Sequence, residues 1–598
     1  MPRRDLLIFS IIYFLCCALY ILRSISLTEP GFPLDDSWIH QVFARNIATG
    51  HGFSFNPGQP IPGATAPLWT LILASTCRPF GPVAGGIATG IAFLWLAFVG
   101  LYKLTVFLAQ NRFKALLTVI LSILCWPVVW GGLSGMEVGL YSCLTFWGLY
   151  FNLSSKAISD NRAYLSYFLF TMAFLARPET AVFLGAAVLR DLYEWLADGH
   201  KSFSPWLWRA MIIILPLIPY FAFNYHITGN LFPLTFTAKV QHKDLFSSIA
   251  NVDIKRIVKS LTFYPLYYIQ DFFRKILAVN PVVIFASIPG FLAIFSGLGR
   301  DKSKMIMFAL AVLLYVPLMG TFVPLYTATF QNYRMSANII PLLMLTGVIG
   351  LWRDRQSQSE RLRRIILISA VGSVTTGLLI GPLFYLFGHK IASLLMSNPS
   401  GYGSQAFLEQ ASFFKDFGYG IAITGGIVFA GALLLHERVS RLQGKNSWRI
   451  AAAATAVTAG LLTFIPKAGL YANNVRNVNE CDVEAGRYLR KAVLPGKVVA
   501  ASDIGAIGYY SELEVVDLKG LISPEITPEM ILNDSLAFEY MNRHKRVDYL
   551  AIAPNWFKYI PKRYDVFEQV ARFVTEDNTI LSGDTLIIYK AKWPDSTR

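Results

Sequence analysis

The stretch LLIFSIIYFLCCALYIL, residues 6–22, is uncharged throughout and follows Arg3 and Arg4. A helix of about 20 apolar residues spans the hydrocarbon core of a bilayer. Similar stretches recur along the 598 residues, of which 54% are hydrophobic and only 15% charged, whereas about a quarter of a soluble protein is charged. No small-residue cleavage site follows the first stretch, so we interpret it as a retained helix. The sequence therefore predicts a polytopic α-helical membrane protein.

We expect about 13 transmembrane helices from the recurrence of such stretches. They are placed at about 6–22, 83–108, 115–130, 137–153, 163–176, 180–196, 208–224, 276–297, 305–323, 338–352, 365–387, 419–436 and 450–465. Basic residues concentrate in alternate short loops, as at Arg3, Arg4 and residues 353–364, while the other short loops hold few. Such an excess is typical of the cytoplasmic side. We therefore predict a multi-pass protein of the inner or plasma membrane, with a cytoplasmic N-terminus and an extracytoplasmic C-terminus.

Two domains follow from this topology. Residues 1–470 form a transmembrane domain with long exported loops at about 24–82 and 225–275, and residues 471–598 form an extracytoplasmic mixed α/β domain. The first loop contains an amphipathic helix at 36–49, expected to lie at the membrane surface. In the C-terminal domain the pattern predicts strands and helices. The strands are at 497–501, 514–517, 549–553 and 585–589, and the helices include 482–493 and 564–574.

Adjacent carboxylates at Asp35 and Asp36 open the amphipathic helix of the first exported loop. Close carboxylates repel, which raises the pKa of one of them and suits it to act as a base. Capping of the 37–49 helix by one of these residues is the alternative interpretation, and the two roles are compatible.

Further polar residues lie at predicted helix ends on the same side of the membrane. They are Glu137, Arg177, Glu179, Asn224, His226, Lys239 and Arg334. Ionisable groups at such positions are costly unless they are paired or functional. A structural ion pair of Arg177 with Glu179 or Glu137 is therefore the alternative to a binding role.

Several classes of protein are excluded or disfavoured. No P-loop or dinucleotide fingerprint is present, so use of cytosolic ATP is not expected. No nucleophile elbow appears, the six cysteines show no metal spacing, and no basic helix or RNA-type motif indicates nucleic-acid binding. The net charge of +16 is instead explained by the cytoplasmic loops.

Several motifs follow one another along the chain. The first exported loop contributes Asp35-Asp36-Ser37-Trp38-Ile39, residues 44–53, Phe55-Asn56-Pro57-Gly58 and residues 63–69. Later motifs are residues 134–137, 176–179, 229–235 with Lys239, 502–510 and 517–521. Together and in this order they resemble those of the GT-C class of membrane glycosyltransferases, and the mycobacterial terminal arabinofuranosyltransferase branch in particular. Two positions depart from the branch, which often has Pro-Asn-Thr where this chain has Pro233-Leu234-Thr235, and Arg-Tyr where it has Arg334-Met335.

The resemblance implies an inverting glycosyltransferase that moves a sugar, arabinofuranose or another pentose, from a polyprenyl-phosphate donor in the membrane to an extracytoplasmic glycan, lipid or glycoprotein. Asp35 or Asp36 would be the catalytic base. A phosphate leaving group needs its charge stabilised, and the expected donor-binding residues are Asn56, Glu137, Arg177, Glu179, His226, Lys239 and Arg334. No cofactor is implied beyond a divalent cation that could assist, for which no dedicated ligand cage is visible.

Transfer of a hexose such as mannose to protein by the same mechanism is one alternative. A transporter or flippase of lipid-linked sugars is another. A transporter predicts inverted repeats and charges at the middle of the membrane, whereas the charged residues here concentrate at one face.

Overall fold

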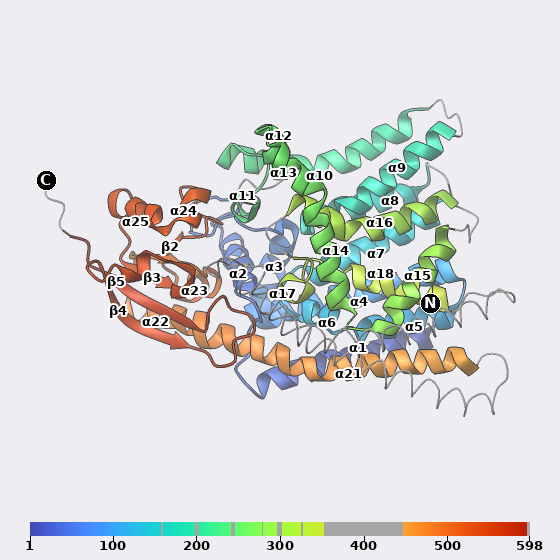
Figure 1. Cartoon of the computed structure of the whole chain (residues 1–598), viewed down its shortest axis with the longest axis horizontal. Coiled ribbons are helices and arrows are strands. Elements are labelled where there is room, and N and C mark those ends of the chain that lie inside the picture. The colour runs from blue at the N-terminus through green and yellow to red at the C-terminus, as the bar shows by residue number, and fades with distance from the viewer. Residues whose placement is uncertain are drawn as a thin grey trace, which may run out of the picture.

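The computed structural model describes residues 1–156, 159–197, 202–240, 245–277, 279–295, 302–323, 327–351 and 447–594. A bundle of helices forms the larger part of the molecule, and a small sheet domain built from the C-terminal residues lies at one end of it (Figure 1). The expected spans at 365–387 and 419–436 lie outside the described residues.

The bundle is built mainly from apolar helices. They are α1 (Arg3–Ile25), α4 (Pro82–Ala109), α5 (Arg112–Ile123), α6 (Trp126–Leu133), α7 (Val138–Ser154), α8 (Asn161–Ala176), α9 (Ala181–Ala197), α10 (Ser204–Thr228), α15 (Pro281–Phe295), α16 (Lys302–Phe322), α18 (Ile339–Leu351) and α21 (Ser447–Val478). One large cluster of buried side chains runs through these helices. Many of their outward-facing residues are also apolar, such as Leu207, Ile214 and Ile218 on α10, which is typical of a surface that meets lipid.

Five helices among the described residues are long and apolar enough to cross a membrane, and six if one bent pair counts as a single span. Several other expected spans coincide with shorter helices, such as α7 with 17 residues and α18 with 13. The protein is therefore a multi-pass membrane protein, while the number of about 13 spans and the orientation stay predictions.

The expected single span at 115–130 is a bent pair instead. The helices α5 and α6 meet at an angle of 64°. Pro127, the second residue of α6, has no N–H to donate and so cannot continue the hydrogen bonds of α5, which favours a break just before it. The chain is accordingly extended at Cys125, before α6.

The loop at about 24–82, which the sequence predicts to be exported, carries α2 (Asp35–Ala48) and α3 (Pro67–Phe80). The expected helix at 36–49 is thus confirmed, but its expected place at the membrane surface is wrong. Buried side chains occupy all sides of α2, including Trp38, His40 and Phe43, because α2 packs between α3 and α23 of the C-terminal domain. The second long loop contains only short helices. They are α11 (Leu234–Val240), α12 (Leu245–Ala250), α13 (Ile254–Leu261) and α14 (Phe263–Ile276).

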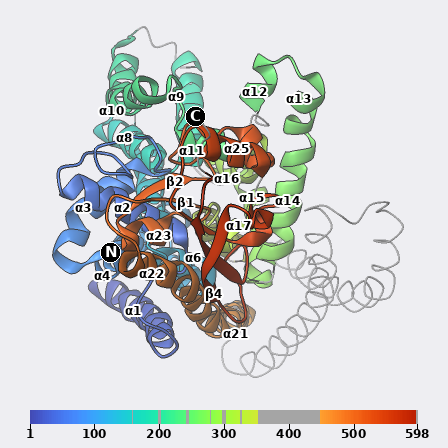
Figure 2. The same ribbon diagram turned by 90° about the vertical axis from the view of Figure 1, so that its left-hand side faces the viewer.

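The C-terminal domain has a five-stranded sheet in the order β2-β1-β3-β5-β4, which faces the viewer in Figure 2. Its strands are β1 (Val498–Ala501), β2 (Glu514–Asp517), β3 (Tyr549–Ile552), β4 (Phe567–Val574) and β5 (Thr585–Ala591). The first three pair in parallel and the last two are antiparallel. The predicted mixed α/β domain and its four expected strands are confirmed.

Side chains alternate between the two faces of the sheet, as a strand requires. Val499 and Ala501 pack with α22 (Glu484–Ala492), α23 (Gly505–Ser511) and α2 of the first loop. Ala500 and Val516 pack on the other face with α25 (Asp534–Arg543); a short helix, α24 (Pro528–Leu532), precedes α25. The loop at about 24–82 is therefore part of the core of the C-terminal domain.

The expected helix at 564–574 is wrong, because residues 564–566 form a turn and residues 567–574 form β4. They include Val566, Phe567, Val570, Phe573 and Val574, and β-branched and aromatic residues favour strands. Pairing with β5 along most of its length fixes the segment as an edge strand, with an irregularity between Gln569 and Ala571.

A long helix joins the bundle to this domain. The helix α21 runs across residue 470, where the sequence places the domain boundary, and continues through a π-helical turn at Asn479–Val483 into α22. It packs along α1, where the Tyr20 hydroxyl donates to the carbonyl of Phe464 at 3.0 Å. The two domains are thus connected by both this continuous helix and the α2 contact.

Candidate active site

Asp35 and Asp36 are the first two residues of α2, but neither caps that helix. Its N-cap residue is Leu34, and no side chain accepts from the free N–H groups of its first turn. The capping interpretation is therefore wrong. The two carboxylates point to different partners, which separates their roles.

Asp35 binds the C-terminal domain. Its carboxylate accepts from the backbone N–H groups of Gly505 and Ala506 at 2.8 and 2.7 Å. These groups belong to the first turn of α23, where anions are favoured. Glycine is required at 505, because a Cβ there would lie 2.1 Å from the carbonyl oxygen of Asp35.

Arg45 holds the other end of the same helix. Its guanidinium donates to the carbonyl of Tyr509 at 2.7 Å and lies 4.7 Å from the centre of that ring. Cations are favoured at the C-terminal end of a helix. Asp35 and Arg45 therefore hold α23 at both ends from one face of α2.

Replacing Asp35 with asparagine is expected to lower the free energy of unfolding by about 1–3 kcal/mol, because the NH2 group of an amide cannot accept a hydrogen bond, whereas both oxygens of the carboxyl group can, ionised or protonated. Burial, with Asp503 nearby, raises the pKa of the Asp35 carboxyl from 3.8 to about 8, although the two N–H groups oppose this. The folded state thus favours the protonated acid. The stability that this preference adds to the folded state is fully present below pH 3.8, and it is lost as the pH rises through about 8.

Thermal unfolding of the two proteins between pH 4 and pH 9 measures both effects, since the difference between them should shrink as the pH rises. Asp565→Asn, at an exposed ion pair with Arg563 in the same domain, is the control. A variant with an unchanged midpoint and an unchanged pH dependence would show that the Asp35 contact does not hold the domain.

Asp36 instead faces the bundle. Its carboxylate accepts from Arg334 at 2.5 Å and from the amide of Gln331 at 3.3 Å, and Arg334 also donates to Gln331 at 2.7 Å. Burial alone would raise the pKa of the Asp36 carboxyl, but Arg334 and Lys239 outweigh it and hold the pKa well below its usual range. Asp36 is therefore an ionised carboxylate at neutral pH.

An unusual turn aims Arg334 at Asp36. The turn lies in the short segment labelled α17 (Phe330–Tyr333). Positive φ angles of 47°, 57° and 66° occur at Gln331, Asn332 and Tyr333. Residues other than glycine rarely adopt this conformation, which costs of order 1–3 kcal/mol each and clusters at functional sites. The carbonyl of Arg334 accepts from the Tyr141 hydroxyl at 2.7 Å, which anchors the turn to α7.

A chain of buried charges continues from Arg334. Its Nε lies 3.6 Å from Oε1 of Glu137, which also binds Arg177, and Arg177 pairs with Glu179 at 2.8 Å. Glu137 is fully buried at the start of α7. The alternative of an Arg177 ion pair with Glu137 or Glu179 is thus confirmed for both partners, and the same chain ends at Asp36.

His40 joins this cluster, although the sequence analysis does not single it out. Its Nδ1 lies 2.8 Å from the hydroxyl of Thr70, which itself donates to the carbonyl of Ala66, so Nδ1 is the donor. Its Nε2 lies 4.0 Å from the Glu137 carboxylate. Burial lowers the pKa of His40 to about 4, so the ring is neutral at neutral pH. The spacing of four residues from Asp36 could have revealed it, because residues i and i+4 share a helix face.

Lys239, on α11, adds a further cation to the cluster. It interacts electrostatically with Asp36, Arg334, Arg177 and Glu137. Within the part of the chain that the structure describes, however, no carboxylate lies within ion-pair distance of it. Burial lowers the pKa of the Lys239 ammonium to about 8, against the opposing effect of Asp36. An anion entering this site would therefore find an ammonium ready to pair.

Two expected site residues lie apart from the cluster. Asn56 uses both ends of its amide on the backbone of Val515, at 3.0 Å each, and so extends the edge of the sheet at β2. His226 is exposed in the last turn of α10. Among the described residues, no group of three or more His, Cys, Asp or Glu side chains is placed to hold a metal ion.

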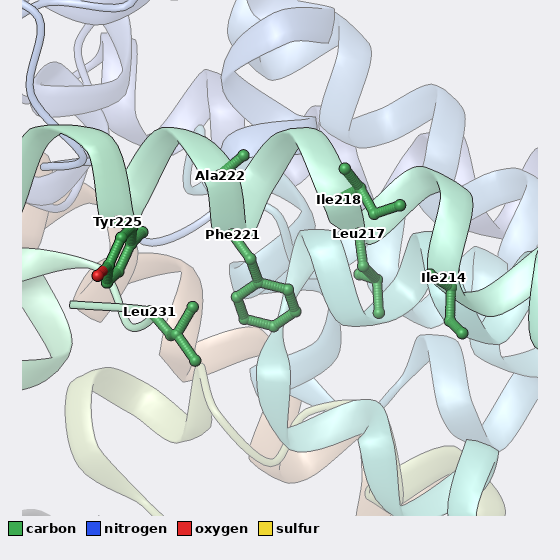
Figure 3. Close-up of a pocket in the computed structure, with 7 residues that line it drawn as sticks. All are labelled: Ile214, Leu217, Ile218, Phe221, Ala222, Tyr225 and Leu231. Atoms are coloured by element: carbon green, nitrogen blue, oxygen red, sulfur yellow. The ribbon is translucent and has the colours of Figure 1, made fainter. Parts of the chain in front are cut away.

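An apolar groove of about 410 Å³ runs along α10 on the approach to α11 (Figure 3). It is lined by Ile214, Leu217, Ile218, Phe221, Ala222, Tyr225 and Leu231. A second apolar pocket, of about 240 Å³, includes Phe223, Asn224 and Pro233 and lies between α3 and α10. The residues after α10 thus connect an apolar surface to the helix that carries Lys239.

Comparison with known structures shows a similarity of fold alone, to structures that have the GT-C fold. The chain is similar over nearly its whole length to ArnT from Cupriavidus metallidurans bound to undecaprenyl phosphate, with a TM-score of 0.53 and 10% sequence identity, covering 98% of this chain and 97% of that one. The apo state of the same protein matches with a TM-score of 0.52 and 12% identity over the same shares. The fold resemblance predicted from the motifs is therefore confirmed, while the arabinofuranosyltransferase branch stays a prediction.

A more distant similarity is to the archaeal oligosaccharyltransferase AglB from Archaeoglobus fulgidus in complex with an inhibitory peptide and a dolichol-phosphate, with a TM-score of 0.41 and 12% identity, covering 97% of this chain and 76% of that one. A family model described as a domain of unknown function, DUF8728, matches residues 469–589. No curated protein matches the chain in sequence.

Proposed function

We propose that this protein is a glycosyltransferase that moves a sugar from a polyprenyl-phosphate donor to a hydroxyl group of an extracytoplasmic acceptor. The observation that carries the proposal is the position of one ionised carboxylate, Asp36, beside Arg334 and Lys239, an ammonium with no carboxylate at ion-pair distance among the described residues. A base next to a site for an anionic leaving group is the arrangement that this transfer requires.

The chemistry is a single displacement. The acceptor oxygen forms a bond to the anomeric carbon and releases its proton to Asp36. The bond from that carbon to the phosphate oxygen breaks, and its electron pair leaves with the polyprenyl phosphate. Lys239 and Arg334 stabilise the charge that develops on the phosphate, and because a phosphate leaves as an anion, no acid is needed to protonate it.

Arg334 also links donor binding to the strength of the base. Its ion pair keeps Asp36 ionised but makes the carboxylate a poor proton acceptor. An incoming phosphate competes for the same guanidinium. Asp36 therefore becomes more basic when the donor is bound, which couples deprotonation of the acceptor to the presence of the donor.

The apolar groove on α10 fits the polyprenyl chain of such a donor. Its side chains are apolar, and the segment that follows it leads to Lys239. The similar structure of ArnT is bound to undecaprenyl phosphate, a lipid of this chemistry. We assign the lipid tail to this groove and its phosphate to Lys239.

The sugar and the orientation of the protein rest on the sequence. The motif resemblance favours arabinofuranose or another pentose, with a hexose such as mannose as the alternative, and the distribution of basic loops places the site outside the cytoplasm. Incubation of the purified protein with synthetic polyprenyl-phosphate arabinose, polyprenyl-phosphate mannose and a panel of glycan acceptors tests the proposal. Transfer or hydrolysis of either donor supports it, and no turnover and no binding of either lipid contradicts it.

Lys239→Gln is expected to weaken binding of undecaprenyl phosphate about tenfold or more, because a charge-assisted hydrogen bond contributes about 1.5–3 kcal/mol. In the wild type, affinity should fall as the pH rises past about 8, where the ammonium loses its proton. Titration of the protein in detergent with the lipid phosphate measures both effects. Lys255→Gln, at an exposed position on α13 in the same loop, is the matched control, and equal affinity in the two variants would remove Lys239 from the site.

A further inference from the structure

A pocket of about 250 Å³ lies where the first exported loop meets the C-terminal sheet, apart from the Asp36 cluster. Residues 55–61 and the end of α10 form one side, and β2 with the segment after it forms the other. Figure 1 shows β2 and α24 on the side of the sheet domain next to this loop. Its polar lining consists of Asn56, Gln59, Ser523, Glu525 and Lys545.

The walls of this pocket are held in place by hydrogen bonds. The double bond of Asn56 to Val515 fixes the loop side. On the sheet side, the Asp517 carboxylate accepts from the backbone N–H groups of Lys519 and Ile522, at 2.8 and 3.2 Å. The backbone N–H of Asp517 donates to the Ser523 hydroxyl at 2.9 Å. The pocket is therefore built from fixed backbone rather than from a loose junction.

Two polar groups in the pocket remain available. The amide of Gln59 and the carboxylate of Glu525 form neither a hydrogen bond nor an ion pair with the residues that the structure describes. Lys545 is paired with Glu514 at 2.6 Å and also interacts electrostatically with Glu525, so one ammonium faces two carboxylates. The charge left over is thus the negative charge of Glu525, which disfavours a phosphate or another anion.

The remaining lining favours a ligand with both apolar and hydroxyl surfaces. Phe55, Ile61 and Ile227 contribute apolar surface, and the amide and the carboxylate contribute groups that accept or donate hydrogen bonds. A neutral sugar ring has C–H faces and a rim of hydroxyls, and so matches this combination. Binding sites of this kind join an apolar lining to a few placed polar groups.

The pocket and Asp36 belong to the same loop. Asp36 lies in the first turn of α2, and residues 55–61, which follow α2, form one wall of the pocket. Both parts contact the C-terminal domain, since α2 packs on α23 and Asn56 bonds to β2. We therefore expect an extended glycan to place one sugar in the pocket while another presents its hydroxyl to Asp36.

We propose that this pocket, at the junction of residues 55–61 with β2 and Glu525, is a subsite for a neutral sugar of the acceptor, away from the reacting hydroxyl. The proposal rests on the proposed function, because it assigns the acceptor of that transfer to the class of neutral oligosaccharides.

The test measures the binding of short arabinofuranose and mannose oligosaccharides to the full-length protein in detergent. Saturation-transfer NMR reports this binding. Gln59→Trp fills the pocket from an exposed turn position, and Glu525→Gln removes its free charge. Each is expected to raise the dissociation constant of the oligosaccharide about tenfold. Glu539→Gln, an exposed position on α25 paired with Arg543, is the matched control and should leave it unchanged.

Titration with undecaprenyl phosphate in the same preparations separates this proposal from the proposed function. Unchanged lipid binding together with weakened oligosaccharide binding in both pocket variants supports the subsite. Oligosaccharide binding that is equal in wild type and in both variants, or absent in the wild type, overturns it. A wild type that binds oligosaccharide at this pocket but no lipid phosphate keeps the subsite and overturns the donor assignment.

Discussion

Asp36→Asn is expected to lower the rate of sugar transfer by about a thousandfold in a protein that still folds. The amide has nearly the shape of the carboxylate and can still accept from Arg334, so the local structure is retained. It cannot take the proton of the acceptor hydroxyl, and a positioned general base contributes about 10²–10⁴-fold to such a reaction. A single-turnover measurement with a labelled lipid donor reports the chemical step directly.

Asp35→Asn is the matched control for this experiment, because it makes the same chemical change at the neighbouring residue. The Asp35 carboxylate is occupied by α23, so this variant should lose stability but keep most of its rate per folded molecule. Loss of transfer in Asp35→Asn with full transfer in Asp36→Asn would reverse the assignment of the base. Full transfer in both variants would contradict the proposed mechanism.

The sequence predicted the helices and strands whose residue pattern lies within one continuous segment. Long apolar runs predict helices such as α1 and α4, and β-branched residues predict strands such as β1 and β5, because burial in lipid or in a sheet demands these residues along a continuous stretch. The segment that became β4 carries Glu568, Gln569 and Arg572 between its apolar residues, a mixed pattern that also suits a helix. Pairing with β5 decided its structure, and such pairing is not visible within the segment itself.

The site was predicted residue by residue, but its connections were not. Asp36, Glu137, Arg177, Lys239 and Arg334 were expected at one face of the membrane domain, and the structure brings them together. The different partners of Asp35 and Asp36 depend on contacts with residues about 300 and 470 positions away in the chain. No spacing rule within a sequence predicts contacts of that range. The left-handed turn that aims Arg334 at Asp36 contains no proline or glycine from which it could be predicted.

Glu137 is the residue on which the buried charges depend. Its fully buried carboxylate lies between Arg177 and Arg334, and His40 faces its second oxygen. Buried cations are stable only while their counter-ions are present, and removing one partner of a buried ion pair costs about 3–5 kcal/mol. We therefore expect Glu137→Gln to lower the free energy of unfolding by about 3–5 kcal/mol, a larger loss than at any other carboxylate of the cluster.

Glu179→Gln is the control, since Glu179 binds the same guanidinium but is slightly exposed and contacts Arg177 alone among the arginines of the cluster. Unfolding followed by tryptophan fluorescence in detergent compares the two variants. The double variant Glu137→Gln with Arg177→Met should lose less than the sum of the two single changes, because the second change removes the charge that the first leaves unpaired. Two results together would contradict this prediction: a Glu137→Gln protein as stable as Glu179→Gln, and additive losses in the double variant. They would show that Arg334 and Arg177 do not depend on Glu137, and that Asp36 and Glu179 hold the cluster separately.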